Sequence, residues 1–203
     1  TGFGCGEPFA IERALVDNYQ NYHDVQIVNM LTLGDSPWCR PEMKGHFTLN
    51  CLFASQSNRK AISLGVSEFT TSHFYEIPDL IKNYIRPRVT IVMVSPPDEH
   101  GYVSFGTTVD YTRGTADYCD IKIAQVNKYM PHTFGNSFMH IRDFTCFVEH
   151  DEPLPEVKAV EISDTEMEIG KYCASLINDG DCLQLGIGGI PNAVCAQLWD
   201  KKD

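Results

Sequence analysis

The pattern of apolar and polar residues in the first third of the chain predicts helices that alternate with a short strand. Two helices are predicted, over residues 8–22 and 57–64. Residues 25–31 predict a strand, and the glycines and prolines of residues 32–48 predict a long irregular segment. The longer helix has apolar residues at helical spacing on one face: Ile11, Ala14, Leu15 and Tyr19.

A continuous apolar run of strand length lies at residues 89–94, and residues 121–126 and 144–148 look similar. Runs without polar alternation are typical of strands that are covered on both faces, as in parallel sheets. Strands of this kind, separated by helices, predict an α/β protein with an open, mostly parallel sheet and flanking helices.

The chain changes character near residue 150, where residues 150–156 are charged and contain two prolines. Ser163 and Glu166 then have the spacing of a capping box that opens a helix. The buried stripe of this helix is predicted to be Ile169, Cys173, Leu176 and Ile177. A short strand over residues 182–185 and a final helix over residues 192–198 are expected to follow.

Two glycine-rich segments share a design, GFGCGEPFAIERAL (2–15) and GIGGIPNAVCAQL (186–198). Aligning Pro8 with Pro191 also pairs the glycines and the apolar helix residues. Duplication of an α/β half explains the similarity, and convergent turn chemistry explains it equally well. The predicted domains are a first α/β domain, a linker and the start of a second, related domain: residues 1–150, 151–162 and 163–203.

The 203 residues carry a formal net charge of −11. This acidity argues against a nucleic-acid partner, because such proteins need basic surface to neutralise phosphates. No apolar run approaches the length of a membrane-spanning helix, and the first residues lack the pattern of a signal peptide. We therefore expect a cytoplasmic protein that has no membrane partner.

Eight cysteines are scattered without a CxxC pair or another short metal-ligand spacing. Cys146, Cys173 and Cys195 lie in apolar patterns, where a free cysteine behaves as a small hydrophobic residue. The polar residues His132, His140 and Asp143 lack the spacing of a zinc site. Reduced, mostly structural thiols and no bound metal are expected.

The GIGGIP turn at residues 186–191 is the strongest candidate for chemistry. A strand that passes through glycines into a helix presents unpaired N–H groups at the positive end of the helix dipole, which suits a phosphate or an oxyanion. A dinucleotide-binding fingerprint is the obvious rival, but its third glycine falls on Pro191. Taken alone, the turn slightly favours a plain strand–helix connection that binds nothing.

A second candidate is the segment SPPDEHGYVSFG (95–106), which directly follows the apolar run 89–94. Loops at the carboxyl ends of parallel strands bind ligands in open α/β sheets. Asp98, Glu99 and His100 offer an acid, a base or a ligand. Solvated turn residues are the simpler interpretation of each of them.

Six strings occur in order along the chain: GFGCGEP (2–8), VNMLTLGDSP (28–37), GHFTLNCLF (45–53), SPPDEHGYVSFG (95–106), AQVNKYMPHTFG (124–135) and LQLGIGGIPNAV (183–194). Together they resemble the acetyl-CoA hydrolase/transferase family, and especially its CoA-transferase members. The resemblance covers essentially the whole chain. It implies a fold of two related CoA-transferase α/β halves.

The resemblance also implies an activity, which is an acyl-CoA:carboxylate CoA-transferase that uses acetyl-CoA with acids of the butyrate or 4-hydroxybutyrate class. The reaction would pass through a glutamyl-CoA thioester, with the coenzyme A thioester as a substrate and no tightly bound cofactor. The partners would be an acyl-CoA, a short-chain carboxylate and further copies of the same chain in a homo-oligomer.

The site residues implied by the resemblance fall into three groups. Ile187 and Gly188 are expected to donate backbone N–H groups to the oxyanion that each addition step develops. The residues expected to hold CoA are Gly186, Gly188, Gly189 and Pro191. The residues expected to line the acyl and carboxylate pocket are Gly4, Cys5, Gly6, Pro97, Glu99, His100 and Gly101.

The nucleophilic glutamate is the residue that the chain does not supply. In the family it lies in an HTE- or HSE-like segment shortly after a charged turn that matches residues 200–203. Glu7, Glu99 and Glu149 lack this context. We therefore expect a missing C-terminal half to carry it, and the chain alone to be inactive. A hydrolase on the same scaffold and a non-catalytic acyl-CoA-binding module stay open as alternatives.

Overall fold

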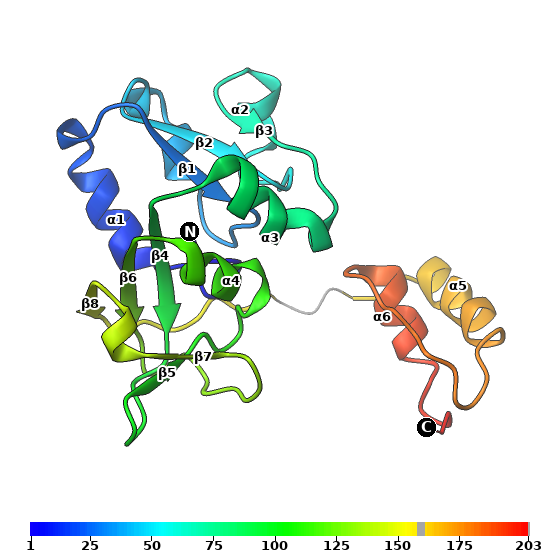
Figure 1. The fold of residues 1–203 in the computed structure, drawn as a ribbon. Coiled ribbons are helices and arrows are strands. Elements are labelled where there is room, and N and C mark those ends of the chain that lie inside the picture. The colour runs from blue at the N-terminus through cyan, green and yellow to red at the C-terminus, as the bar shows by residue number, and fades with distance from the viewer. Residues whose placement is uncertain (158–160, 203) are drawn as a thin grey trace. The chain divides into compact units, whose positions relative to one another are not determined.

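The computed structural model describes residues 1–157 and 161–202. The chain divides into two compact units, Thr1–Glu156 and Val157–Asp203 (Figure 1). Among the described residues, no helix has both the length and the apolar character that crossing a membrane requires. The first unit is an α/β structure with mostly parallel strands and flanking helices, as the sequence predicts.

The first sheet of this unit has three parallel strands in the order β1-β2-β3. These are β1 (Val25–Asn29), β2 (Phe47–Cys51) and β3 (Glu68–Phe69). The predicted strand at residues 25–31 is confirmed, with its ladder ending at Asn29. The core around this sheet is built from buried apolar side chains: Val16, Ile27, Trp38, Met43, Phe47, Leu49 and Cys51.

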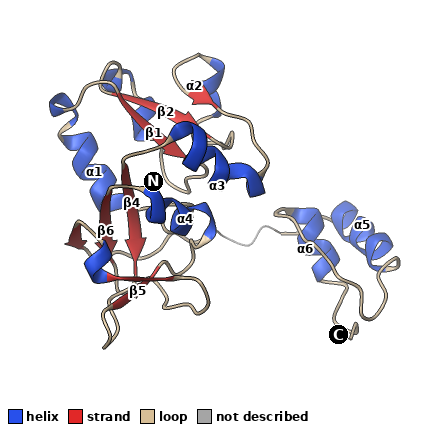
Figure 2. Ribbon diagram, in the orientation of Figure 1, coloured by secondary structure: helices blue, strands red, loops and turns tan. Residues whose placement is uncertain are grey.

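The second sheet, also parallel, has the order β4-β6-β8, and Figure 2 shows β4 and β6 side by side. Its strands are β4 (Val89–Val94), β6 (Ile121–Val126) and β8 (Cys146–Glu149). The first two lie where the apolar runs predict them. All four residues of β8 are exposed, so the prediction that this strand is covered on both faces is wrong. Its side chains lie outside the apolar cluster that buries Val92 and Val94 of β4, and Cys146 is exposed rather than buried.

A short antiparallel pair, β5 (Tyr102–Ser104) and β7 (Phe138–His140), accompanies the second sheet. Val103 and Phe105 are fully buried here, in the same apolar cluster as the β4 side chains. The sequence predicts one sheet, whereas the structure has two parallel sheets and this antiparallel pair.

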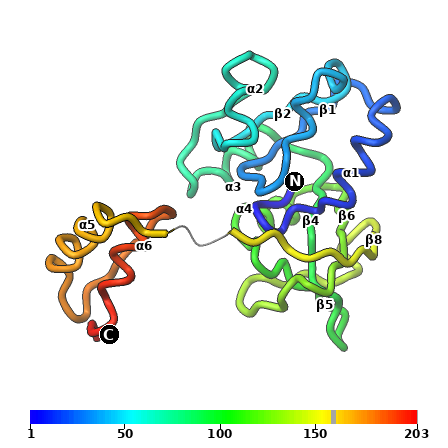
Figure 3. Tube along the Cα trace, turned by 180° about the vertical axis from the view of Figure 1, so that it is seen from behind, coloured from blue at the N-terminus to red at the C-terminus, as the bar shows by residue number. Residues whose placement is uncertain are grey.

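Four helices flank the sheets of the first unit: α1 (Phe9–Asp17), α2 (Arg59–Ser63), α3 (Ile77–Leu80) and α4 (Asp110–Tyr118). A π-helical turn, Ile81–Ile85, continues α3. The helix predicted at residues 8–22 is α1 followed by a 3-10 turn, Tyr19–Asn21. Seen from behind, the N-terminal residues lie in the middle of this unit, beside α4 and β4 (Figure 3). Short 3-10 turns complete it: Pro37–Cys39, Pro41–Met43, Phe74–Glu76 and Ile141–Asp143.

The second unit contains two helices, α5 (Asp164–Ala174) and α6 (Gly189–Cys195). The predicted capping box is confirmed, since the Ser163 N–H donates to the Glu166 carboxylate at 2.8 Å and the Glu166 N–H donates to Ser163 Oγ at 3.3 Å. Gly170 lets the helices approach closely, because a Cβ at this position would lie 2.7 Å from the Ala193 carbonyl.

Two predictions for this unit are wrong. The stripe of Ile169, Cys173, Leu176 and Ile177 is not the buried face of α5, because Leu176 is 80% exposed and contact with α6 is made through smaller residues that permit a close approach. The strand at residues 182–185 does not form. A strand needs a neighbour for its N–H and C=O groups, and residues 161–202 contain no other strand. Cys195 is also exposed rather than packed in a core.

Candidate active site

The loop of Gly4, Cys5 and Gly6 is held in place by the chain that follows β1. Gly4 forms a parallel bridge with Thr32, and its N–H donates to the Leu31 carbonyl at 2.8 Å. Its φ of +57° lies in the left-handed region that favours glycine. A Cβ at Gly6 would overlap the side chain of Thr108. The backbone path of this loop therefore requires both glycines.

The same loop brings three of the sequence motifs into contact. The Cys5 thiol donates to Thr107 Oγ1 at 3.3 Å, and the Thr107 hydroxyl donates to Met130 Sδ at 3.7 Å. A Cβ at Gly106 would overlap Met130, so the glycine permits this approach. Thr107 and Met130 are site residues that the sequence did not single out, although both lie in or beside the quoted motifs.

Two buried carboxyl groups follow the loop in the chain. Glu7 is 1% exposed and Glu12 is 5% exposed. Glu7 Oε1 accepts a hydrogen bond from Asn29 Nδ2 at 2.7 Å, while its Oε2 has no partner among the described residues. Burial raises the pKa of Glu7 to about 8, and the charge of Glu12 adds to this rise. Burial also raises the pKa of Glu12 to about 7, against the pull of the Thr1 ammonium group.

These values make Glu7 an anchor rather than a reactive group. At neutral pH a carboxyl with a pKa of about 8 holds its proton, and a protonated carboxylic acid is a poor nucleophile. Its hydrogen bond to Asn29 ties the start of α1 to the end of β1.

The SPPDEHG loop is a compact turn built around Asp98. The Asp98 carboxylate accepts N–H bonds from His100 at 2.9 Å and from Tyr102 at 2.8 Å, and these bonds lower its pKa. Gly101 has φ of +81°, and a Cβ there would lie 3.0 Å from His140 Nε2. Glu99 and His100 project into solvent as an exposed pair with an Nε2–Oε1 distance of 3.6 Å. Asp98 and Gly101 thus shape the loop, while Glu99 and His100 are free to meet a ligand.

A cavity of about 450 Å³ lies beside this loop, at the carboxyl ends of β4, β6 and β8. It is lined by Pro96, Pro97, Val126, Lys128, Glu149, His150 and Asp151. Lys128 Nζ lies 2.8 Å from Asp151 Oδ2 and supplies a cation at this edge of the sheet. Lys128 falls inside the AQVNKYMPHTFG motif, and a lysine just after a buried strand was the available signal for it.

Two buried side-chain amides, one in β6 and one directly after it, bind the chain that follows β8 to this edge of the sheet. The Gln125 and Asn127 side chains are fully buried. Gln125 Nε2 donates to Glu152 Oε1 at 2.8 Å, and Asn127 Nδ2 donates to the Glu152 carbonyl at 2.7 Å. Gln125 Oε1 also accepts the Ala10 N–H at 2.9 Å, which ties α1 to the same network. Residues 150–152, predicted as part of a charged linker segment, are therefore attached to the first unit.

The GIGGIP turn lies in the second unit, where it leads into α6. Gly188 has φ of +144° at the N-terminal cap of α6, and Ile187 is 99% exposed. Among the described residues, neither the Ile187 nor the Gly188 N–H is used in a hydrogen bond. The Glu166 carboxylate lies against Gly189, because a Cβ there would overlap it. The turn thus offers free donors, with one carboxylate nearby.

The predicted pocket residues fall into separate places. Gly4, Cys5 and Gly6 meet Thr107, whereas Pro97 lines the cavity beside Lys128. No hydrogen bond among the described residues joins the two segments. Within the described ranges, no three His, Cys, Asp or Glu side chains converge as a metal site would require.

Comparison with known proteins places the chain in a family. Residues 1–158 match the acetyl-CoA hydrolase/transferase N-terminal domain, and the chain belongs to this family. Over 98% of its length it is 43% identical to the 4-hydroxybutyrate coenzyme A transferase of Clostridium kluyveri. Over 97% it is 30% identical to the butyryl-CoA:acetate CoA-transferase of Anaerostipes caccae. The chain spans 46% of each of these two relatives, about half of their length.

Solved structures agree with this assignment. RipA from Yersinia pestis superposes with a TM-score of 0.91 at 29% identity, over 98% of this chain and 49% of that one. The 4-hydroxybutyrate CoA-transferase of Porphyromonas gingivalis gives a TM-score of 0.81 at 38% identity, over 100% of this chain and 47% of that one. The fold class and the family predicted from the sequence are therefore confirmed.

Proposed function

We propose that the chain is the N-terminal part of an acyl-CoA:carboxylate CoA-transferase that uses acetyl-CoA with acids of the butyrate or 4-hydroxybutyrate class. The observation that carries this proposal is the family match, together with relatives named as CoA-transferases along nearly the whole chain. Since the chain spans about half of those relatives, the activity is proposed for the longer protein and not for this segment alone.

The proposed reaction uses a glutamate from the part of the protein after Asp203. Its carboxylate attacks the thioester carbonyl and expels CoA thiolate, which leaves a mixed anhydride. The thiolate then attacks the glutamyl carbonyl and releases the first acid, giving glutamyl-CoA. The second acid runs the same steps in reverse and leaves as a new acyl-CoA. The burial of Glu7, with its raised pKa, supports a nucleophile from outside this chain.

Three segments of the chain are assigned roles in this reaction. The N–H groups of Ile187 and Gly188 stabilise the developing oxyanion, and Gly186, Gly189 and Pro191 shape the turn for CoA. The free N–H groups of the turn support this role. The residues proposed to line the acyl and carboxylate side of the pocket are Gly4, Cys5, Gly6, Pro97, Glu99, His100 and Gly101. The exposure of Glu99 and His100 supports their part.

The remaining parts of the proposal concern cofactor, assembly and compartment. Coenzyme A enters as a thioester substrate, and no tightly bound cofactor is needed for acyl transfer to a carboxylate. The enzyme is proposed to be a homo-oligomer of the cytoplasm. The eight unpaired cysteines support a reducing compartment.

The test is product analysis on the longer protein. Acetyl-CoA is mixed with butyrate or 4-hydroxybutyrate, and the CoA thioesters are followed by mass spectrometry. The proposal requires the new acyl-CoA to form faster than free CoA. Free CoA without acyl exchange would show a hydrolase instead, and binding without either product would show a non-catalytic acyl-CoA-binding protein.

A further inference from the structure

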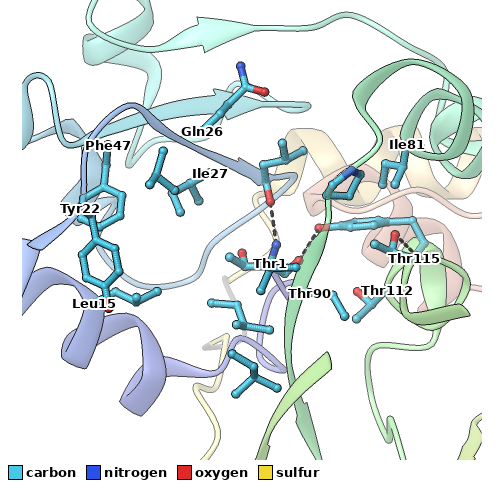
Figure 4. Close-up of a pocket in the computed structure, with 17 residues that line it drawn as sticks. Thr1, Leu15, Tyr22, Gln26, Ile27, Phe47, Ile81, Thr90, Thr112 and Thr115 are labelled. Atoms are coloured by element: carbon cyan, nitrogen blue, oxygen red, sulfur yellow. Dashed lines mark hydrogen bonds between the residues drawn. The ribbon is translucent and has the colours of Figure 1, made fainter. Parts of the chain in front are cut away.

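The cavities of the first unit differ in whether they leave a polar group free for a small acid. An apolar cavity of about 390 Å³ is lined by residues of β1 and β4, and Figure 4 shows Thr1 among its lining residues. The backbone groups of Thr1 are already paired, since its amino group donates to the Val28 carbonyl at 2.7 Å and its carbonyl accepts from the Tyr111 hydroxyl at 3.2 Å. A carboxylate without a partner is costly to bury, so this cavity does not suit the acid substrate.

A short segment of the AQVNKYMPHTFG motif contacts both parts of the predicted substrate pocket. The Thr107 hydroxyl, which accepts from the Cys5 thiol, donates to Met130 Sδ at 3.7 Å. Two residues further along, His132 Nδ1 lies 3.1 Å from the Oγ of Ser95, the first residue of the SPPDEHG loop. The segment therefore reaches the Cys5 loop through Thr107 at one end, and the SPPDEHG loop through Ser95 at the other.

The hydrogen bonds of Ser95 decide which nitrogen of the His132 ring carries a proton. A hydroxyl has one proton to donate and two lone pairs that accept. Ser95 Oγ accepts the Ser104 N–H at 2.9 Å and lies 3.0 Å from the Pro96 carbonyl oxygen, which can only accept. If the Ser95 proton went to His132, two acceptor oxygens would face each other at 3.0 Å without a proton between them. The proton of Ser95 therefore goes to Pro96, and the network assigns His132 Nδ1 as a donor to Ser95.

This assignment leaves an acceptor on the other side of the ring. A neutral imidazole with its proton on Nδ1 has a bare lone pair on Nε2. His132 is exposed, and among the described residues its hydrogen bond is the one that Nδ1 makes to Ser95. The ring also packs against Phe138, with a distance of 5.0 Å between the ring centroids. His132 thus presents Nε2 to solvent in an orientation that Ser95 and Phe138 fix.

The charges near this acceptor select what it can bind. The N–H groups of Tyr102 and His100 lower the pKa of Asp98, which therefore stays negatively charged. His132, when protonated, adds to this shift, so the two side chains lie near each other. A carboxylate of a bound acid is an acceptor only, and it is repelled by the Nε2 lone pair, by Asp98 and by the exposed Glu99. A neutral hydroxyl is not repelled, and it can donate to Nε2.

We propose that His132 determines which acid the enzyme prefers, by accepting at Nε2 a hydrogen bond from the hydroxyl of a hydroxy acid such as 4-hydroxybutyrate. This inference rests on the proposed transferase function and concerns the acid substrate of the same pocket. The carboxylate of the acid points away from the SPPDEHG loop, and its hydroxyl end points toward His132. An acid with a methyl group in place of the hydroxyl leaves Nε2 without a donor, and sites that hydrogen-bond a substrate group select against analogues that lack it.

The test compares two acids of similar size on the longer protein, with acetyl-CoA as the CoA donor. 4-Hydroxybutyrate has a terminal hydroxyl where pentanoate has a methyl group. Product analysis by mass spectrometry gives kcat/KM for each acid, and the unmodified enzyme is expected to prefer 4-hydroxybutyrate. His132→Asn keeps an amide N–H near the position of Nδ1 and has no group at the position of Nε2. It is expected to lower the preference by about 3- to 10-fold, the effect of one hydrogen bond, through a higher KM for 4-hydroxybutyrate.

Two further variants separate recognition of the hydroxyl from folding. His132→Gln places an amide oxygen near the position of Nε2 and is expected to restore most of the preference. His73→Asn is the matched control, because His73 is an exposed histidine that caps a helical turn outside the pocket, and asparagine also fills this role. It should leave the ratio of the two kcat/KM values unchanged. Both acids are measured on one preparation, so a variant that folds poorly alters both rates and not their ratio.

Three results would overturn the proposal. An equal loss of kcat/KM for both acids in His132→Asn would show that the ring only supports the loop. An unchanged ratio would show that Nε2 does not meet the hydroxyl. A nitrogen NMR spectrum of isotope-labelled histidines, recorded at a pH where the rings are neutral, is expected to show the proton of His132 on Nδ1, and a proton on Nε2 instead would remove the acceptor. If the unmodified protein formed no new acyl-CoA from either acid, the proposed function itself would fail, and the NMR spectrum would still decide the state of Nε2.

Discussion

Replacing Glu7 by glutamine isolates the effect of its buried carboxyl group on stability. Glutamine keeps the carbonyl oxygen that accepts from Asn29 Nδ2 and cannot ionise. Glu7 is 1% exposed, and its pKa is raised from 4.5 to about 8, first by burial and then by the charge of Glu12. Ionisation of Glu7 therefore costs free energy in the folded chain, and the glutamine variant does not have this cost.

The sign and the size of the effect follow from the raised pKa. A carboxyl whose pKa is raised in the folded state stabilises the folded chain fully at a pH below its unfolded-state pKa. This stabilisation is lost as the pH rises through its folded-state pKa. Between pH 4.5 and about 8 the folded chain holds the Glu7 proton more tightly than the unfolded chain does. The free energy of unfolding should fall by up to about 1.4 kcal/mol per pH unit, or about 5 kcal/mol over the interval.

Two neighbouring groups with shifted pKa values also contribute to the pH dependence of stability. Glu12, whose pKa is raised to about 7, acts in the same direction as Glu7. The Thr1 amino group acts in the opposite direction, because burial lowers its pKa. Both remain in Glu7→Gln, so the difference between the two proteins reports the ionisation of Glu7 together with its coupling to these two groups.

Urea unfolding at pH 5, 6, 7 and 8 measures this difference. Glu7→Gln is expected to flatten the decline, and to be more stable than the unmodified chain at pH 8 by several kcal/mol. Glu99→Gln is the matched control, since Glu99 is exposed, and it should leave the pH dependence unchanged. The reasoning is refuted if Glu7→Gln and the unmodified chain lose stability in parallel as the pH rises.

Three further predictions concern the glycine loops and the thiol. Gly6→Ala should lower the free energy of unfolding by about 1–3 kcal/mol, because its Cβ overlaps the buried Thr108 side chain. Gly114→Ala in α4, which has open space around it, should raise the Tm slightly. Equal Tm shifts of the two variants in thermal melts would contradict this. Cys5→Ser in the longer enzyme should keep most of the transferase activity, because the thiol only donates to Thr107; a loss of several orders of magnitude would make Cys5 the nucleophile. Gly188→Ala in the longer enzyme should lower kcat by about a hundredfold while the Tm changes by a few degrees; early melting with normal turnover of the folded fraction would remove the oxyanion role.

The sequence predicts the parts of the fold that depend on burial of continuous apolar runs. Strands β4 and β6 lie where the mostly apolar runs at residues 89–94 and 121–126 predict them, because the apolar side chains of such runs require cover. The run at residues 144–148 has the same composition, yet β8 is an exposed edge. Whether the side chains of a strand are covered depends on the elements packed against it, which the composition of the strand does not reveal. Residues 182–185 show the same limit, since residues 161–202 contain no strand with which they could pair.

The site is predicted less completely than the fold, for a related reason. The glycines at positions 4 and 6 are recognisable because backbone geometry excludes other residues there. The buried state of Glu7 and Glu12 is not recognisable, because carboxylates are usually exposed and nothing local in the sequence marks these two as enclosed. Thr107 and Met130 reach the Cys5 loop only through the tertiary fold.

The attachment of residues 150–152 has a mechanical consequence. A force that pulls on the chain beyond residue 152 reaches the bonds from Asn127 and Gln125 to Glu152, and the ion pair of Lys128 with Asp151, before it reaches the ladder of β8. These contacts would have to break first, so they shield an exposed edge strand from being peeled off. The polar side chains around the end of β6 would thus act as a clamp that keeps tension in the following chain from unravelling the sheet.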